Sequence, residues 1–80
     1  MRLDKFLKNS RIIKRRTVAK EACEQGRVIV NGRVAKAGTD ICIDDEIVIT
    51  FGSNVLKIQV AELLESQKKD NAEKMYNVIS

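Results

Sequence analysis

The chain of 80 residues contains no histidine, no tryptophan and no proline. Without histidine it lacks the side chain that most often acts as a general base near neutral pH and most often binds zinc. Cys23 and Cys42 stand far apart, so the sequence holds neither a CxxC metal motif nor a dense disulfide pattern. We therefore expect no metal, no cofactor and no enzymatic activity.

Long apolar runs are also missing. No stretch approaches the roughly 20 apolar residues that span a bilayer. Residues 1–5 are charged from the start and contain no apolar core of a secretory signal. A chain of this length has room for one small domain. We expect a cytoplasmic protein that makes no membrane contact.

Positive charge is concentrated in the N-terminal part of the chain. Residues 1–36 carry 11 Lys/Arg and 3 Asp/Glu, a net +8, whereas residues 37–80 carry 4 and 8, a net −4. All six arginines lie in the first part, and arginine suits bidentate contacts with phosphate. This asymmetry favours a polyanionic partner that meets the N-terminal half first. A solvated basic face without a partner is the alternative.

The apolar spacing predicts two helices. Apolar residues at i, i+3 and i+4 from Leu3 predict a short helix over residues 2–8. A second helix is expected over residues 15–25, because Gly26 stands where a glycine closes a helix. Its expected buried stripe consists of Val18, Ala19, Ala22 and Cys23.

The remainder of the chain predicts a small sheet. Asn31-Gly32 accepts positive φ at both positions, which a two-residue hairpin turn requires, so residues 27–30 and 33–36 are expected to pair. Further strands are expected at residues 41–43, 46–51 and 55–60. The apolar residues 75–79 are expected to form a tail or a helix that begins near Asp70. The predicted fold is α+β, with two short helices packed on one face of a mainly antiparallel sheet.

Cations crowd the predicted start of the second helix. Lys14, Arg15 and Arg16 lie at the positive end of the helix dipole, which disfavours each charge by about 0.3–1 kcal/mol. A bound phosphate reverses this conflict, because the dipole and the free backbone N–H groups both attract an anion. Lys20 shares a helix face with Arg16.

The hairpin presents a similar conflict. In the expected register Arg27 faces Lys36, and like charges opposite each other are destabilising. Because one anionic ligand would relieve both conflicts, the sequence favours nucleic-acid binding. No helix carries a dense Asn/Gln/Arg row for reading a DNA major groove, so RNA is the expected ligand. With two Phe and one Tyr, aromatic stacking is scarce, and phosphate and shape recognition should dominate.

Two other signals are weaker. The acidic residues 44–46 could suggest paired catalytic carboxylates, but neighbours in a tight turn point apart and a solvated acidic turn is favoured. Both cysteines are expected to be small buried hydrophobic residues. A reactive thiol at Cys23, near Lys20, is the minor alternative.

Three segments together resemble the S4 RNA-binding domain. They are Arg2-Leu3-Asp4-Lys5-Phe6-Leu7, Arg16-Thr17-Val18-Ala19 and Gly26-Arg27-Val28-Ile29-Val30-Asn31-Gly32. The resemblance covers residues 1–50 and implies an S4-type (alpha-L) fold there. Residues 51–80 would then be a C-terminal strand extension and tail of the same compact unit. Among S4 proteins, the chain resembles the stand-alone family that includes RqcP and the heat-shock S4 protein. Within that family it looks closest to RqcP.

This resemblance implies an RNA-binding factor of ribosome-associated quality control. Such a factor binds the split, obstructed large ribosomal subunit at 23S rRNA and peptidyl-tRNA. It holds the tRNA while an RqcH-type factor adds a C-terminal alanine tail.

Carried over by position, Arg2 and Arg16 are the first expected RNA contacts. Further contacts are expected from Lys14, Arg15, Lys20, Arg11, Arg27 and Lys36. The chain departs from many S4 domains just before the second helix, where Ile13-Lys14-Arg15 replaces a Ser or Arg-Ser. The start of that helix and its local contact geometry are therefore left open.

Two other functions remain open at this point. One is a ribosome assembly or structural factor that binds rRNA stably. The other is an RNA-handling accessory subunit of an enzyme complex, with residues 75–79 as its docking element.

Overall fold

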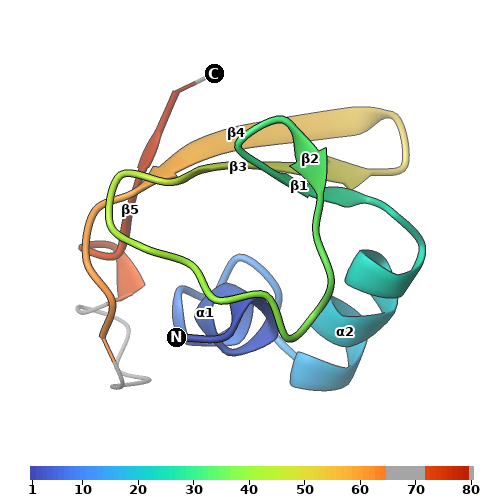
Figure 1. Ribbon diagram of the computed structural model, residues 1–80, viewed down its shortest axis with the longest axis horizontal. Helices are drawn as coiled ribbons and strands as arrows, with labels where there is room; N and C mark the ends of the chain where they lie inside the picture. Colours follow the sequence, from blue (N-terminus) through green and yellow to red (C-terminus); the bar gives the residue numbers. More distant parts are fainter. Residues whose placement is uncertain (65–71, 80) are drawn as a thin grey trace.

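The computed structural model describes residues 1–64 and 72–79. The elements are α1 (Leu3–Asn9), α2 (Arg16–Glu24), β1 (Val28–Val30), β2 (Arg33–Val34), β3 (Glu46–Phe51), β4 (Asn54–Val60) and β5 (Tyr76–Val78). The strands form one antiparallel sheet in the order β2-β1-β3-β4-β5. Both helices lie on the same side of it (Figure 1). The predicted α+β fold is confirmed.

The core lies between the helices and the sheet. On the helix side, the i, i+3, i+4 triplet of α1 is fully buried, as its spacing predicts. On the sheet side, alternate residues of β3 and β4 turn inward. These core residues are Leu3, Phe6, Leu7, Ile47, Ile49, Ile58 and Val60. Within the described residues, no helix has the length and apolar character needed to cross a membrane.

The segment after the hairpin fixes the start of α1. The backbone N–H of Leu3 donates to the carbonyl of Thr39 at 2.8 Å, and that of Asp4 donates to the carbonyl of Ala37 at 3.1 Å. These bonds satisfy N–H groups that the first turn of a helix leaves unpaired. A β-bridge between Arg2 and Asp40 adds to the connection. The position of Arg2 is thus set by chain far from it in sequence.

The predicted Asn31-Gly32 hairpin is confirmed. Both residues have positive φ, 51° and 82°, and Val30 pairs with Arg33 across the turn. The Asn31 side chain also reaches the next turn of the chain, donating to Asp45 Oδ1 at 3.0 Å. Its own Oδ1 accepts the backbone N–H of Glu46 at 2.9 Å.

The predicted strand over residues 41–43 is wrong. The carboxylate of Asp45 accepts the backbone N–H of Cys42 at 2.7 Å, and the N–H of Asp45 donates back to the Cys42 carbonyl at 3.2 Å. This local side-chain bond holds a turn in place of a strand ladder. Cys42 is consequently exposed, contrary to the prediction that it is buried.

The second helix begins at Arg16 and ends at Glu24, one residue inside each predicted bound. Ala19 and Cys23 face the core as expected, but Val18 is 47% exposed. On a helix this short, one narrow stripe reaches the core, and Val18 lies on its flank.

The last described residues form a strand. Tyr76–Val78 make β5, which pairs with β4 through Ile58↔Val78 and Val60↔Tyr76. Residues 75–79 were expected to form a tail or a helix, and of these alternatives the helix is wrong at residues 76–78. Its expected start near Asp70 lies outside the described residues. The edge of β4 offers unpaired backbone groups that a returning strand satisfies. Met75 is fully buried just before β5.

Candidate nucleic-acid interface

A groove of about 560 Å³ runs between α2 and the segment that follows β2. Three of the predicted RNA-binding cations border it. Its lining consists of Arg2, Lys20, Cys23, Glu24, Gly26, Val34, Ala35, Lys36, Ala37 and Gly38. We call it the basic groove.

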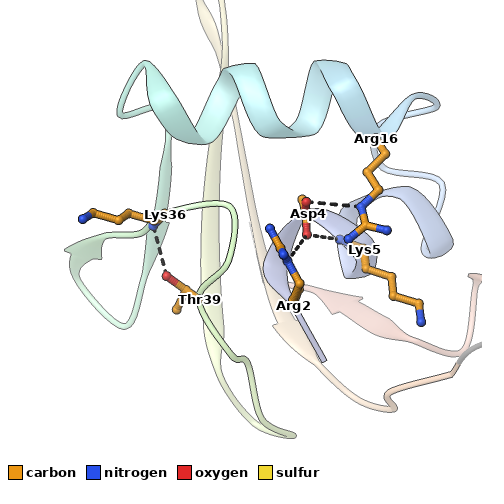
Figure 2. Close-up of polar contacts among 6 residues, drawn as sticks. All are labelled: Arg2, Asp4, Lys5, Arg16, Lys36 and Thr39. Carbon is orange, nitrogen blue, oxygen red and sulfur yellow. Dashed lines mark hydrogen bonds and ion pairs between the residues drawn. The ribbon is translucent and has the colours of Figure 1, made fainter.

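Beside the basic groove, a buried carboxylate joins two arginines from different elements. Asp4 is 2% exposed, and its Oδ1 accepts Nε of Arg2 at 3.3 Å while its Oδ2 accepts Nε of Arg16 at 3.2 Å (Figure 2). The backbone N–H of Lys5 donates to Oδ1 at 2.8 Å. The side chains of Arg2 and Arg16 remain 52% and 48% exposed. We call these three residues the Arg–Asp–Arg cluster.

The carboxyl of Asp4 is ionised in this setting. Burial alone would raise its pKa, but the hydrogen bond from Arg16, the Lys5 N–H and the positive charges of Arg16 and Arg2 outweigh burial and lower the pKa below its usual value. Because the carboxylate accepts a hydrogen bond from the Nε of each arginine, it restricts how each guanidinium can rotate. Two guanidinium groups held in this way can meet a phosphate without first losing much rotamer freedom.

The Arg2 side chain lies close to Gly38. A Cβ atom there would lie 3.6 Å from Arg2 Nη2, 3.7 Å from Cζ and 4.0 Å from Nε. These are ordinary contact distances for a Cβ, so the guanidinium lies near Gly38 with room for a small side chain between them.

The structure brings together four of the eight predicted RNA-binding residues. Arg2, Lys20 and Lys36 line the basic groove, and Arg16 joins them through Asp4. Positive charges from the residue that precedes α1, from α2 and from the segment after β2 thus lie close together. Up to 34 positions separate them in sequence.

The other four predicted residues lie outside the basic groove. Lys14 and Arg15 are exposed just before α2, where Arg15 is the N-cap and its side chain makes no capping hydrogen bond. Arg11 is exposed and has φ of 61°. Arg27 borders a separate hollow of about 200 Å³ beside Phe51. The expected opposition of Arg27 and Lys36 falls beyond the paired rows, which end at Ile29↔Val34.

Sequence reasoning missed Asp4 and Gly38. One signal could have pointed to Asp4: it is the sole acidic residue among the first 20, in a segment rich in cations. A lone acid there has several available partners, and burial in an ion-pair cluster is a natural outcome. Nothing in the sequence shows that Gly38 packs against Arg2, because that contact exists only once the chain has folded.

The cysteine of α2 does not supply a reactive group. Burial, followed by the negative charges of Asp4 and Glu24, raises the pKa of Cys23 to about 11, so its thiol stays protonated at neutral pH. In the part of the chain that the structure describes, no group of three or more His, Cys, Asp or Glu side chains is arranged to hold a metal ion.

Two helices on a five-stranded antiparallel sheet, with basic residues converging beside α2, define an S4-type RNA-binding domain. The family model of the S4 domain matches residues 1–47. In the solved structure of heat shock protein 15 from Vibrio cholerae, the same fold superposes with a TM-score of 0.92 at 27% identity, covering 100% of this chain and 82% of that one.

Proteins called RQC P-site tRNA stabilizing factor are similar over almost the whole length. The one from Halalkalibacterium halodurans is 55% identical over 98% of this chain and 89% of its own. The one from Streptococcus pneumoniae is 54% identical, and the match covers 100% of this chain and 91% of that protein. The chain belongs to the S4 domain family and, within it, to the family that these relatives represent.

Proposed function

We propose that this protein is a non-catalytic RNA-binding factor of ribosome-associated quality control that acts in the cytoplasm. It binds the split, obstructed large ribosomal subunit at 23S rRNA and peptidyl-tRNA. There it holds the tRNA in place while an RqcH-type factor adds a C-terminal alanine tail. The near-full-length similarity to RQC P-site tRNA stabilizing factors supports this role.

The observation that carries the proposal is the Arg–Asp–Arg cluster beside the basic groove. Arg2 and Arg16 are half-exposed, come from separate elements and share one buried carboxylate. Lys20 and Lys36 extend the positive surface along the groove. Two pre-oriented guanidiniums with two nearby ammonium groups suit contacts with successive phosphates of a folded RNA.

The proposed mechanism is positional. The protein supplies charges that hold RNA backbone, and it leaves peptide-bond chemistry to the large subunit. We assign RNA contact first to Arg2 and Arg16 and then to Lys20 and Lys36, and we assign outer phosphate contacts to Lys14, Arg15, Arg11 and Arg27. We also propose that residues 1–50 form the S4 domain and that residues 51–80 extend its sheet within one compact unit.

The test is binding of the purified protein to isolated large subunits, with and without peptidyl-tRNA, at two salt concentrations. Preference for the tRNA-loaded subunit is the expected result. Equal binding to loaded and empty subunits would point to an rRNA-binding assembly factor, and absence of binding to either would refute the ribosomal role. Arg16→Ala should reduce binding, whereas Arg33→Ala, which changes an exposed arginine of β2 outside the basic groove, should not.

A further inference from the structure

Part of the lining of the basic groove is apolar, although phosphate contacts do not require an apolar surface. Val34 lies on β2 with 66% of its surface exposed, and Ala35 and Ala37 are buried beside it. Cys23, whose thiol is protonated, also lines the groove. Phosphate is strongly hydrated and gains nothing from such a surface, whereas the face of a nucleobase does.

The guanidinium of Arg2 is presented to the groove in a particular way. Its distances from a Cβ built at Gly38 are 3.6, 3.7 and 4.0 Å for Nη2, Cζ and Nε. Because the three distances are nearly equal, a Cβ at position 38 would lie over the guanidinium plane and not at its edge. The Nε edge is engaged by Asp4. One face of the plane is thus turned toward Gly38, and half of the side chain remains exposed.

We propose that the basic groove receives one unpaired nucleotide of the bound RNA. Its base stacks on the face of the Arg2 guanidinium that is turned away from Gly38, and it rests against Val34. Guanidinium planes stack bases in this manner in single-stranded RNA recognition. Lys20 and Lys36, which also line the groove, contact the flanking phosphates. The carboxylate of Glu24 is the acidic group of the lining and is an acceptor for an exocyclic amino group of the base.

The size of the groove fits this occupant. At about 560 Å³ it falls within the roughly 300–1,000 Å³ of sites that take small organic ligands. A paired base stays inside its stack and cannot enter, so the protein would distinguish loops and bulges from continuous duplex. This inference rests on the proposed RNA-binding function and adds a substrate feature to it.

The experiment compares three RNA hairpins with the same stem. One is fully paired, one carries a single bulged adenosine, and one carries an abasic nucleotide at the bulge. Affinities are measured by fluorescence anisotropy with the full-length protein. The bulged hairpin should bind about tenfold more tightly than the abasic one, since stacking of one base commonly contributes that much. This comparison needs no change to the protein.

Two substitutions locate the base in the groove. Val34→Thr replaces one methyl by a hydroxyl and should weaken binding of the bulged hairpin about fourfold, with little change for the abasic one. Val34→Phe adds a stacking surface and should strengthen binding of the bulged hairpin alone. The matched control is Val55→Thr, because Val55 is 62% exposed on β4 and lies outside the lining of the groove.

The failures of the two proposals are distinguishable. Equal affinity for the bulged and abasic hairpins would overturn the nucleotide site and leave RNA binding intact. Equal effects of Val34→Thr and Val55→Thr would also overturn it, because the base would then lie elsewhere. Absence of binding to all three hairpins and to large subunits would overturn the proposed function, and the nucleotide site with it.

Discussion

Asp4 controls more of the site than its single charge suggests. It stands between two cations that belong to different elements, and its burial keeps water from competing for its oxygens. A buried carboxylate needs such partners, and the two guanidiniums gain a fixed orientation in return. Arg2 and Arg16 therefore form one unit, so changes at either residue are expected to be non-additive.

Arg16→Ala tests the contribution of one guanidinium to RNA binding. Loss of a charge-assisted phosphate contact should weaken RNA affinity by about 1–3 kcal/mol. Asp4 would keep Arg2 and the Lys5 N–H as partners, so the melting temperature should fall only slightly. Affinity for a bulged hairpin and thermal melting followed by circular dichroism provide the two readouts. A melting shift large enough to unfold the protein under binding conditions would refute a direct role of Arg16.

Asp4→Asn removes the negative charge of the Arg–Asp–Arg cluster and nearly preserves the shape of the side chain. In the wild-type protein the pKa of Asp4 is lowered on folding, so its ionised form stabilises the folded state at pH above the unfolded pKa of about 3.9. That stabilisation is lost as the pH falls through the lower, folded pKa. The variant should be less stable by about 1–3 kcal/mol at pH 7, and the difference should shrink progressively below about pH 4.

Urea unfolding of both proteins from pH 7 to pH 3 measures this difference. Asp40→Asn is the control, since Asp40 is exposed and its carboxylate has no ion pair among the described residues. A stability difference that does not change with pH would show that the charge of Asp4 does not stabilise the fold.

At the level of residues, the sequence predicted the cations but not their arrangement. Arg2 and Arg16 emerged from the family motif, Lys20 from its spacing to Arg16, and Lys36 from the hairpin register. The geometry depends on a carboxylate 12 positions before Arg16, and it places Arg2 close to a glycine 36 positions later in the chain. Such long-range contacts are set by packing, so local sequence patterns do not predict them.

At the level of elements, local signals were reliable and pairing across the chain was not. The Asn31-Gly32 hairpin and the glycine that ends α2 depend on backbone preferences of one or two residues, and both were predicted. The acidic turn at residues 44–45 was also predicted, but the side-chain bond from Asp45 to the Cys42 N–H, which replaces the expected strand over residues 41–43, was not. β5 exists because the edge of β4 is available, which the sequence around residues 75–79 does not show.

Truncation after Lys74 tests the role of β5. It removes Met75, which is fully buried, and the three strand pairs that cover the edge of β4. Losing a large buried side chain alone destabilises by about 2–5 kcal/mol, comparable to the whole stability expected of a domain this small. The truncated chain should lose cooperative melting in circular dichroism. If it instead stayed folded, bound RNA normally and lost only a protein partner, residues 75–79 would be a docking element.

A shorter truncation at the C-terminus gives the matched control. Removal of Ile79 and Ser80 spares Met75 and all three pairs of β5. Ile79 is 47% exposed, although its N–H donates to the Lys57 carbonyl. This shorter truncation should lower the melting temperature by a few degrees at most, which separates the effect of β5 from that of the terminus.

On the scale of the whole molecule, the charge imbalance along the sequence becomes an imbalance in space. The basic groove and the Arg–Asp–Arg cluster gather cations from residues 2–36, the part of the chain with net charge +8. If the proposed function holds, this charge distribution draws an approaching RNA toward the surface to which we assign the contacts.

Salt dependence should report how many of these charges meet phosphate. Each neutralised phosphate contributes about 0.7–0.9 to the slope of log affinity against log salt. Arg2, Arg16, Lys20 and Lys36 converge, so the slope for a bulged hairpin should be about −3. Arg16→Ala should reduce its magnitude by about 0.7–0.9, whereas Arg33→Ala should leave it unchanged because Arg33 lies outside the groove. A slope near zero would mean that phosphate contacts do not provide the affinity. A slope near −6 would show that the cations to which we assign outer phosphate contacts on the ribosome also contact this short hairpin. These cations are Arg11, Lys14, Arg15 and Arg27.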